Sequence, residues 1–278
     1  MGYFVTGATG FIGRNLVELL LEREGTIYVL VREGSRGRLE ELINRWNADE
    51  GRIVPVIGDL SQRRLGVAEE EIERLRGEID HFFHLAAIYD LKADANSQRV
   101  ANVEGTRHAV QLAGAVDAGH FHMVSSIAAA GLYKGTWRED MFDEATDVDN
   151  HPYFQTKHDS ERVVREECPQ PWRVYRPGIV VGHSETGEMD KVDGPYYFFK
   201  LIRRIRQAVP SWMPMPGVEG REINIVPVDF VVKAMDHIAH EEGLDYRAFS
   251  LTDPNPLTAG EVIDVFAKAA HAPEAAVH

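Results

Sequence analysis

The chain has 278 residues, of which 44% are hydrophobic and 27% charged, and its 30 basic against 44 acidic residues give a formal net charge of −14 at pH 7. This is the composition of a folded protein with a large core, and its negative charge argues against nucleic acid or an anionic membrane as the main partner. No apolar run approaches the ~20 residues of a membrane span, and the single cysteine, Cys168, excludes an intrachain disulfide and a cysteine zinc cage and favours the cytoplasm.

Short β-branched and aromatic runs alternate with amphipathic segments along the chain. The predicted strands cover residues 3–6, 26–31, 52–57, 81–85, 120–125 and 172–175. The predicted helices between them cover residues 13–23, 38–47, 69–75, 97–115 and 153–167. Strands and helices in this order imply right-handed βαβ crossovers. The sequence therefore predicts an α/β fold, a Rossmann-like doubly wound parallel sheet with helices on both faces.

The alternation breaks down after residue 180. Residues 182–195 are polar and rich in turn residues, and residues 210–221 contain several prolines and glycines. We expect residues 1–180 to form a dinucleotide-binding core, and residues 181–278 to form mainly a smaller substrate-binding lobe with some segments returning to the core. A last predicted helix, 258–271, precedes small residues typical of a linker, so we expect the natural protein to continue beyond this point.

Three glycines lie between the first strand and the first helix, where dinucleotide-binding proteins bind their cofactor. Gly7 allows a tight turn, Gly10 lets the backbone approach a pyrophosphate, and Gly13 lets the helix pack closely on the strand. The N–H groups and the dipole of the helix N-terminus then bind the anion. The other residues of the predicted cofactor loop are Thr9, Phe11 and Ile12. The competing interpretation is a flexible surface turn.

Arg32 ends the second strand, where proteins that prefer NAD usually have an acidic residue that binds the ribose 2′-hydroxyl. A guanidinium suits a 2′-phosphate instead, and Arg36 follows closely. The sequence therefore predicts NADPH as the cofactor; the competing interpretation is a solvated loop cation. Asp59 and Leu60, after the third strand, are predicted to contact the adenine, although an aspartate there is often only a helix cap.

Tyr153 and Lys157 are four residues apart, so a helix over 153–167 places the phenol and the ammonium on one face. The ammonium and a positive nicotinamide favour the phenolate, which lowers the pKa of the tyrosine and lets it transfer a proton. Ser126, after the fifth strand, is placed to bind the same substrate oxygen. Asn102 is predicted to order a water or the backbone for proton relay. Alone, Tyr-x-x-x-Lys is often an ordinary helix pair. Its position after the glycine turn and Ser126 favours the catalytic interpretation.

Six motifs follow one another along nearly the whole chain. They are Gly7-x-x-Gly10-x-x-Gly13, His84-Leu85-Ala86-Ala87, Asn102-x-x-Gly105-Thr106, Val124-Ser125-Ser126, Tyr153-x-x-x-Lys157 and Arg176-Pro177-Gly178. This ordered set resembles the extended short-chain dehydrogenase/reductase superfamily. The resemblance implies that Ser126 and Tyr153 bracket the substrate oxygen and that Lys157 holds the nicotinamide ribose. It also assigns to the cofactor site Ala86, Ala87, Pro177, Gly178 and Ile179.

Four longer segments narrow the resemblance: 121–128, 151–157, 183–190 and 224–229. They resemble the N-terminal part of bacterial fatty acyl-CoA reductases that join two reductase domains in one chain, and related thioester-reductase domains. The resemblance implies NADPH-dependent reduction of a long-chain fatty acyl thioester, linked to CoA or to an acyl carrier protein, or of the fatty aldehyde derived from it. It also implies a second reductase domain in the full-length protein.

Two other classes of function fit the same motifs. A sugar-nucleotide epimerase or dehydratase, or another carbonyl reductase, shares the fold and the Ser/Tyr/Lys set, and net consumption of NADPH separates a reductase from an epimerase. A redox sensor or scaffold would bind the nucleotide without chemistry, and the intact Ser/Tyr/Lys set argues against it.

A predicted aromatic helix over 196–207 also contains four basic residues, Lys200, Arg203, Arg204 and Arg206. On an acidic protein these would form a docking face for CoA phosphates or an acidic carrier protein. The competing interpretation is a solvated face over an apolar core stripe. None of the 12 histidines lies in a set with metal-ligand spacing, so no metal site is predicted.

Overall fold

The computed structural model describes residues 1–86, 99–189, 199 and 220–272. The chain forms two compact units: the first comprises Met1–Pro177 and Val228–Leu251, and the second Gly178–Pro227 and Thr252–His278. Some predicted features lie outside the described residues. They are Ala87, residues 97–98 of the helix expected at 97–115, the basic helix at 196–207 apart from Phe199, and most of the stretch at 210–221.

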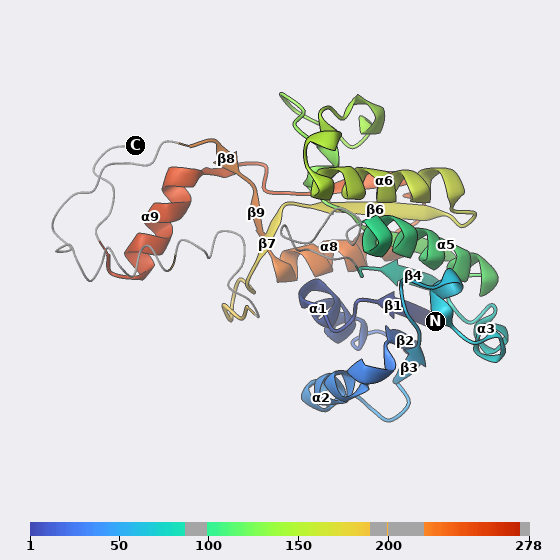
Figure 1. Ribbon diagram of the computed structural model, residues 1–278. Coiled ribbons are helices and arrows are strands. Elements are labelled where there is room, and N and C mark those ends of the chain that lie inside the picture. Colours follow the sequence, from blue (N-terminus) through green and yellow to red (C-terminus); the bar gives the residue numbers. More distant parts are fainter. Residues whose placement is uncertain (87–98, 190–198, 200–219, 273–278) are drawn as a thin grey trace. The chain divides into compact units, whose positions relative to one another are not determined.

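A seven-stranded parallel sheet forms the centre of the first unit (Figure 1). Its strands are β1 (Gly2–Thr6), β2 (Thr26–Val31), β3 (Ile53–Ile57), β4 (His81–His84), β5 (His120–Val124), β6 (Trp172–Pro177) and β10 (Arg247–Leu251). Their order is β10-β6-β5-β4-β1-β2-β3, and every neighbouring pair is parallel. The predicted Rossmann-like sheet is thus confirmed. Because the order reverses between β1 and β4, the carboxyl ends of these strands border the crevice in which such sheets bind ligands.

Helices cover both faces of this sheet. They are α1 (Phe11–Leu20), α2 (Arg36–Trp46), α3 (Glu69–Leu75), α5 (Gly105–Ala115), α6 (Pro152–Glu167) and α8 (Val228–His240). Side chains alternate along each strand, so Phe4 of β1 joins a core with α3, α5 and α6, whereas the hydroxyl of neighbouring Tyr3 lies 3.0 Å from Nε2 of His240 on α8. On that second face α1 packs against α8. The buried residues of α1, Gly13, Leu16, Val17 and Leu20, follow the spacing of a helix with one apolar face.

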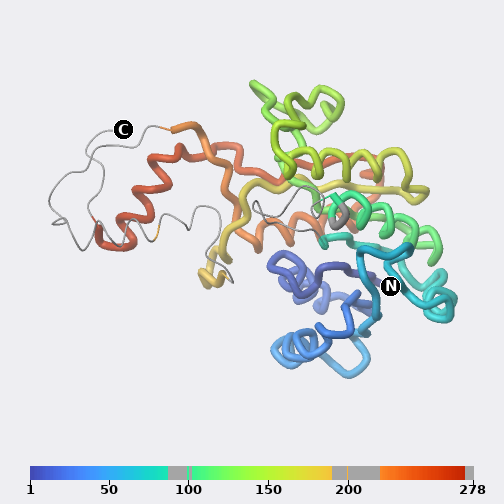
Figure 2. The backbone as a smooth tube through the Cα atoms, viewed as in Figure 1, coloured from blue at the N-terminus to red at the C-terminus, as the bar shows by residue number. Residues whose placement is uncertain are grey.

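Two elements of the first unit come from the C-terminal third of the chain. Figure 2 shows how the chain leaves the sheet after β6 and returns as α8, drawn in orange. Buried Val228, Val231, Val232 and Met235 of α8 cover the sheet, and β10 then pairs with β6. Sequence analysis expected segments to return to the core without giving their bounds, and it predicted neither element.

The second unit contains short strands and one described helix. The strands are β7 (Ile179–Val181), β8 (Glu222–Ile223), β9 (Ile225–Pro227) and β11 (Leu257–Thr258), paired β7 with β9 and β8 with β11. Helix α9 (Ala259–Ala269) lies within the helix predicted at 258–271 and begins with a capping box between Thr258 and Glu261. The side chain of Asn224 bonds both the N–H and the carbonyl of Asp253, and so ties the β8–β9 turn to the segment before β11.

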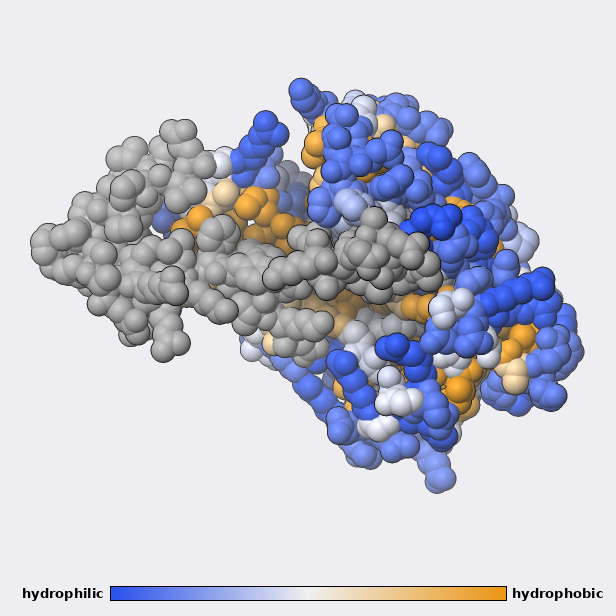
Figure 3. Space-filling view, in the orientation of Figure 1, coloured by the Kyte–Doolittle hydropathy of each residue, from blue (hydrophilic) through white to orange (hydrophobic). Residues whose placement is uncertain are grey.

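The face of the protein visible in Figure 3 is largely hydrophilic where the residues are described. Across the described ranges, no helix is long and apolar enough to cross a membrane.

Candidate active site

The three glycines of the first βα turn have different physical roles. Gly7 has φ +75°, and a Cβ there would lie 2.7 Å from the Ala86 nitrogen. A Cβ on Gly13 would lie 2.1 Å from the Gly7 oxygen. Gly10 has an ordinary φ of −81°, and its Cβ would meet only the Gly7 oxygen, at 3.1 Å. Conformation and packing therefore require Gly7 and Gly13, whereas the missing side chain of Gly10 leaves the backbone open to a ligand.

The positive end of the α1 dipole lies at this turn. Gly10 is the N-cap of α1 and makes no side-chain capping bond, and the first turn of the helix contains no acidic residue. The N–H groups of a first turn have no partner within the helix, and the dipole favours an anion. Thr9, Phe11 and Ile12 are half-buried around the turn. The turn therefore fits the pyrophosphate of a dinucleotide.

Basic side chains lie near the same end of the sheet. Arg32 directly follows β2 and is exposed. Arg14, which sequence analysis did not select, directly follows Gly13 and has its guanidinium 5.4 Å from the centroid of the Phe11 ring. Arg36 is half-exposed and lies 3.7 Å from the Glu33 carboxylate. Of the two arginines predicted to bind the 2′-phosphate, Arg36 lies near a carboxylate, and Arg32 is therefore the more accessible to a phosphate.

Asp59 and Leu60 follow β3, as predicted, and both are engaged locally. The Asp59 carboxylate accepts hydrogen bonds from the Ser61 hydroxyl at 2.6 Å and the Ser61 N–H at 2.8 Å. These bonds, with a smaller contribution from Arg32, lower the pKa of Asp59. The Leu60 carbonyl accepts from Nδ1 of His108 at 2.8 Å. Both Ser61 bonds go to Oδ1 of Asp59 and close a local turn after β3.

Tyr153 and Lys157 lie on the buried face of α6. Pro152 at the first position and Nδ1 of His151, which accepts from the Tyr153 N–H at 3.1 Å, fix the start of the helix. The Lys157 ammonium lies 5.9 Å from the centroid of the Tyr153 ring, and the two residues are 6% and 9% exposed. Burial lowers the pKa of Lys157 to about 8. Phenol and ammonium are thus neighbours in a site with little water.

Ser126 follows β5 and begins a short 3₁₀ turn, Ile127–Ala130. Its Oγ accepts from the Ala128 N–H at 3.1 Å, which leaves the hydroxyl proton for an acceptor. His158 of α6 donates from Nδ1 to the Ala129 carbonyl at 3.0 Å and so holds this turn against α6. Neighbouring Ser125 is 3% exposed, and its Oγ has no hydrogen-bond partner among the described residues. A buried hydroxyl of this kind is suited to a ligand's polar atom.

Asn102 is brought to the same helix by Thr156. Its Nδ2 lies 3.4 Å from the Thr156 hydroxyl, which donates to the Tyr153 carbonyl at 3.1 Å. The predicted helix at 97–115 is not uniform, because Val100–Glu104 forms a π-helical segment before α5. Such segments are frequent at functional sites.

Sequence reasoning missed a buried ion pair that joins α6 to the end of β6. Glu161 and Arg176 are both fully buried, with Nη2 of Arg176 2.5 Å from Oε1 of Glu161. The guanidinium also lies 4.0 Å from the ring centroid of Trp137. Glu161 follows Lys157 by four residues, so helical spacing would have placed it on the same buried face. Pro177 comes directly after Arg176, and Gly178 and Ile179 begin the second unit.

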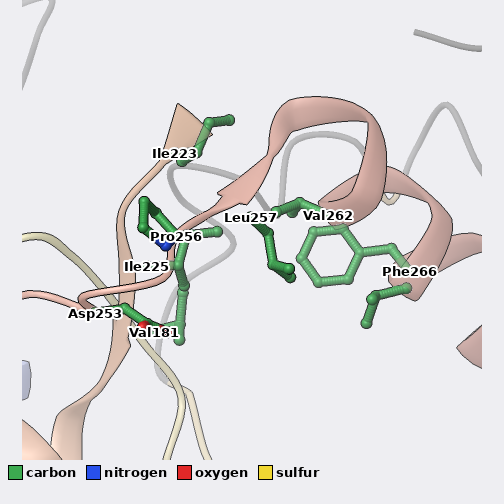
Figure 4. Close-up of a pocket in the computed structure, with 9 residues that line it drawn as sticks. Val181, Ile223, Ile225, Asp253, Pro256, Leu257, Val262 and Phe266 are labelled. Carbon is green, nitrogen blue, oxygen red and sulfur yellow. The ribbon is translucent and has the colours of Figure 1, made fainter. Parts of the chain in front are cut away.

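The second unit contains an apolar hollow of about 200 Å³ (Figure 4). It is lined by Val181, Ile223, Ile225, Asp253, Pro256, Leu257, Val262, Val265 and Phe266. The Phe266 ring also contacts Phe199, with 5.0 Å between the ring centroids. The lining suits a hydrocarbon group better than a sugar, because eight of the nine side chains are apolar.

In the part of the chain that the structure describes, no group of three or more His, Cys, Asp or Glu side chains could hold a metal ion.

The sequence matches a family model of NAD-binding domains, described as "Male sterility protein", over residues 5–235. It is 32% identical over 266 residues to a linear gramicidin synthase of Brevibacillus parabrevis, covering 90% of this chain and 5% of that protein. It is 30% identical over 273 residues to "Aldehyde reductase lnbA" of Aspergillus flavus, covering 91% of this chain and 26% of that protein. The curated relatives first in similarity are covered over only 5–27% of their own length.

Two solved structures are similar to this chain and support the match to the family model. The terminal R domain from the myxalamid PKS-NRPS biosynthetic pathway has a TM-score of 0.78 at 30% identity, covering 92% of this chain and 66% of that one. A thiolation-reductase di-domain from an archaeal non-ribosomal peptide synthetase has the same TM-score at 19% identity, which shows the shared fold. The match over most of the chain shows that it belongs to the NAD-binding Male sterility protein family within the extended short-chain dehydrogenase/reductases, and is a nicotinamide-dependent oxidoreductase.

Proposed function

We propose that this chain is an NADPH-dependent reductase of a long-chain acyl thioester, linked to CoA or to a carrier protein, or of the aldehyde derived from it. The observation that carries the proposal is the buried pair of Tyr153 and Lys157 on one face of α6, with buried Asn102 of the neighbouring π-helical segment bonded to the same helix through Thr156. The names of relatives support a carrier-linked substrate, because they include a terminal R domain and a thiolation-reductase di-domain. The apolar hollow of the second unit supports an apolar acyl group.

Four residues would carry the reaction. When bound, NADPH supplies the hydride that adds to the carbonyl carbon. Tyr153 then gives its phenol proton to the carbonyl oxygen, and Ser126 donates a hydrogen bond to the same oxygen. Lys157 stabilises the resulting phenolate; with a pKa of about 8 it is mostly protonated at pH 7. Asn102 holds the first turn of α6 through Thr156 and orders the water that returns a proton.

The overall reaction balances for a thioester. One thioester, one NADPH and one proton give one aldehyde, one free thiol and one NADP⁺, because the carbon–sulfur bond breaks after the carbonyl carbon is reduced. A second NADPH and a second proton convert the aldehyde to an alcohol.

Residues of the glycine turn and of the β2 end would hold the cofactor. The open backbone at Gly10 and the uncapped end of α1 support pyrophosphate binding there. Exposed Arg32, with Arg36, would bind the 2′-phosphate, and Arg14 is a further cation at the turn. The proposed cofactor site also includes Ala86, Ala87, Pro177, Gly178 and Ile179, with Asp59 and Leu60 toward the adenine.

The test offers NADPH with a long-chain acyl-CoA, a short-chain acyl-CoA, a fatty aldehyde and a UDP-sugar in separate reactions. We expect NADPH oxidation with the long-chain thioester or the aldehyde, and slower oxidation with the short-chain thioester. Conversion of the UDP-sugar without net NADPH oxidation would contradict the proposal and identify an epimerase or dehydratase. NADPH binding without turnover of any substrate would identify a sensor.

A further inference from the structure

A chain of buried hydrogen bonds runs from β1 through β4 to α5, with His84 at its centre. The Thr6 hydroxyl lies 2.9 Å from Nδ1 of His84, and the Thr106 hydroxyl lies 3.2 Å from Nε2 of the same ring. At one end the Ala86 N–H donates to Thr6 Oγ1 at 3.3 Å. At the other end the Thr106 hydroxyl donates to the Asn102 carbonyl at 2.6 Å. The chain thus joins the strand before the glycine turn to the π-helical segment.

The two ends of this chain fix the direction of every proton in it. A carbonyl oxygen only accepts, so Thr106 uses its one hydroxyl proton on Asn102 and must accept from His84. Nε2 of His84 therefore has the proton. In a neutral ring Nδ1 then has none, so it accepts from the Thr6 hydroxyl, and Thr6 in turn accepts from the Ala86 N–H. All donors point the same way, from β4 toward Asn102.

The surroundings of His84 keep its ring neutral. The residue is 2% exposed, and burial, with a smaller contribution from the Lys157 ammonium, lowers the pKa of His84 to about 3. Protonation would also put an N–H on Nδ1, and the Thr6 hydroxyl would then lose the acceptor of its own proton. The ring is thus a hydrogen-bond donor of fixed orientation across the whole neutral range.

We propose that His84 is a positioning residue which, as the neutral Nε2–H tautomer, orients Thr106 and through it the Asn102 carbonyl. The π-helical segment that contains Asn102 packs against α6. Asn102 in turn contacts Thr156, which bonds the Tyr153 carbonyl. The inference rests on the proposed roles of Asn102 and Tyr153, because its effect on turnover passes through them.

The same chain of hydrogen bonds also connects the phosphate-binding turn at Gly7 with Asn102 in the proposed active site. Ala86, the first donor, is the residue whose nitrogen closely approaches Gly7 of the phosphate turn. Thr6 directly precedes that glycine. A shift of the end of β4 would therefore move both the turn and Asn102. The hydrogen bonds fix the position of the turn relative to that of Asn102.

The first test is spectroscopic and needs no substrate. Nitrogen-15 NMR of the histidine rings in the whole protein reports the tautomer, and a His84→Gln variant identifies the His84 signals. We expect a protonated Nε2 and an unprotonated Nδ1, unchanged from about pH 8 to about pH 5. A protonated Nδ1, or titration of His84 within that range, would overturn the inference whatever reaction the protein catalyses.

The second test measures turnover in Thr106→Val and Thr106→Ser. Valine removes the hydroxyl, and we expect kcat to fall about tenfold, as for the loss of one orienting hydrogen bond, with KM for the carbonyl substrate little changed. Serine keeps the hydroxyl and should restore kcat. The control is Ser160→Ala, which removes another buried hydroxyl that bonds a backbone carbonyl of α6, at 2.6 Å.

The comparison separates positioning from general destabilisation. We expect Ser160→Ala to lower Tm by an amount similar to that of Thr106→Val and to leave kcat near that of the wild type. An unchanged kcat in Thr106→Val, or an equal fall in Ser160→Ala, would overturn the inference. Failure of every acyl substrate would instead count against the proposed function, and the tautomer would still be measured.

Discussion

At the scale of single residues, the cofactor site depends on which charges remain available to a ligand. Arg32 is exposed at the end of β2, whereas Arg36 lies near Glu33, and Asp59 is bonded to Ser61. Sequence position alone could not distinguish these states, because each residue follows a strand at the same edge of the sheet. For the two arginines, the competing side chains decide how readily each guanidinium can bind a phosphate.

Arg32→Asp tests the cofactor preference. The variant should raise KM for NADPH by about tenfold or more, because a 2′-phosphate then meets a carboxylate, and it should improve the use of NADH. Steady-state kinetics with both nucleotides measures the ratio. Arg38→Asp, the same charge change at an exposed position of α2, is the matched control. Equal effects of the two variants would show that only net charge matters.

The buried ammonium of Lys157 predicts how activity depends on pH. Burial lowers the pKa of Lys157 from 10.5 to about 8, so the ammonium is lost as the pH rises through about 8. The proposed mechanism needs the charged form, and kcat/KM should therefore fall above that pH, since this parameter reports groups of the free enzyme. A pH–rate profile that stays level to about pH 10 would contradict this role.

At the scale of elements, the sequence predicted most strands of the sheet, but it predicted neither the π-helical segment nor the buried ion pair that packs α6 against β6. Strands such as Thr26–Val31 are short β-branched runs bounded by turns, so their pattern is local. The π-helical segment at Val100–Glu104 packs through tertiary contacts, such as the one from Asn102 Nδ2 to the Thr156 hydroxyl of α6, which no periodicity indicates. The spacing of Tyr153 and Lys157 is visible in the sequence, and so is that of Glu161 and Arg165, but the fully buried partner of Glu161, Arg176, lies far away in the sequence on β6.

The Glu161–Arg176 pair predicts a large loss of stability when one partner is removed. Glu161→Gln leaves the buried Arg176 guanidinium without its counter-charge and also removes the ion pair between Glu161 and Arg165, and we expect the free energy of unfolding to fall by about 3–5 kcal/mol. Denaturant unfolding measures this. Glu167→Gln on the same helix is the control, because Glu167 pairs with Arg107 at an exposed position and should change stability by under about 1 kcal/mol. A similar small loss in both variants would contradict the account.

At the scale of the whole molecule, buried histidines make the first unit sensitive to acid. Nδ1 of His81 lies 3.0 Å from Nε2 of His122, with His120 and His240 beside them and Arg173 and Arg23 nearby. Burial, followed by these neighbouring positive groups, lowers the pKa of His81 to about 3 and that of His122 well below its ordinary value. His84, on the other face, behaves likewise.

The direction of the resulting pH effect follows from proton linkage. Below about pH 6.5 these histidines bind protons in the unfolded chain but not in the folded one. Stability is therefore lost as the pH falls, by up to about 1.4 kcal/mol per pH unit for each histidine. Carboxylates with lowered pKa, such as Asp59, contribute only at lower pH. The free energy of unfolding should fall between about pH 6.5 and about pH 5, and a constant value there would contradict this.

In the proposed reduction of an acyl thioester, or of the aldehyde derived from it, Tyr153 supplies the proton to the carbonyl oxygen. The direct measurement follows NADPH oxidation and free thiol together, with a long-chain acyl-CoA, for the wild type and for Tyr153→Phe. We predict one thiol per NADPH when the product is the aldehyde, or one per two when it is the alcohol. In the variant we predict turnover lower by about a hundredfold or more with NADPH binding retained. Thiol release without NADPH oxidation, or an unchanged rate in Tyr153→Phe, would contradict the account.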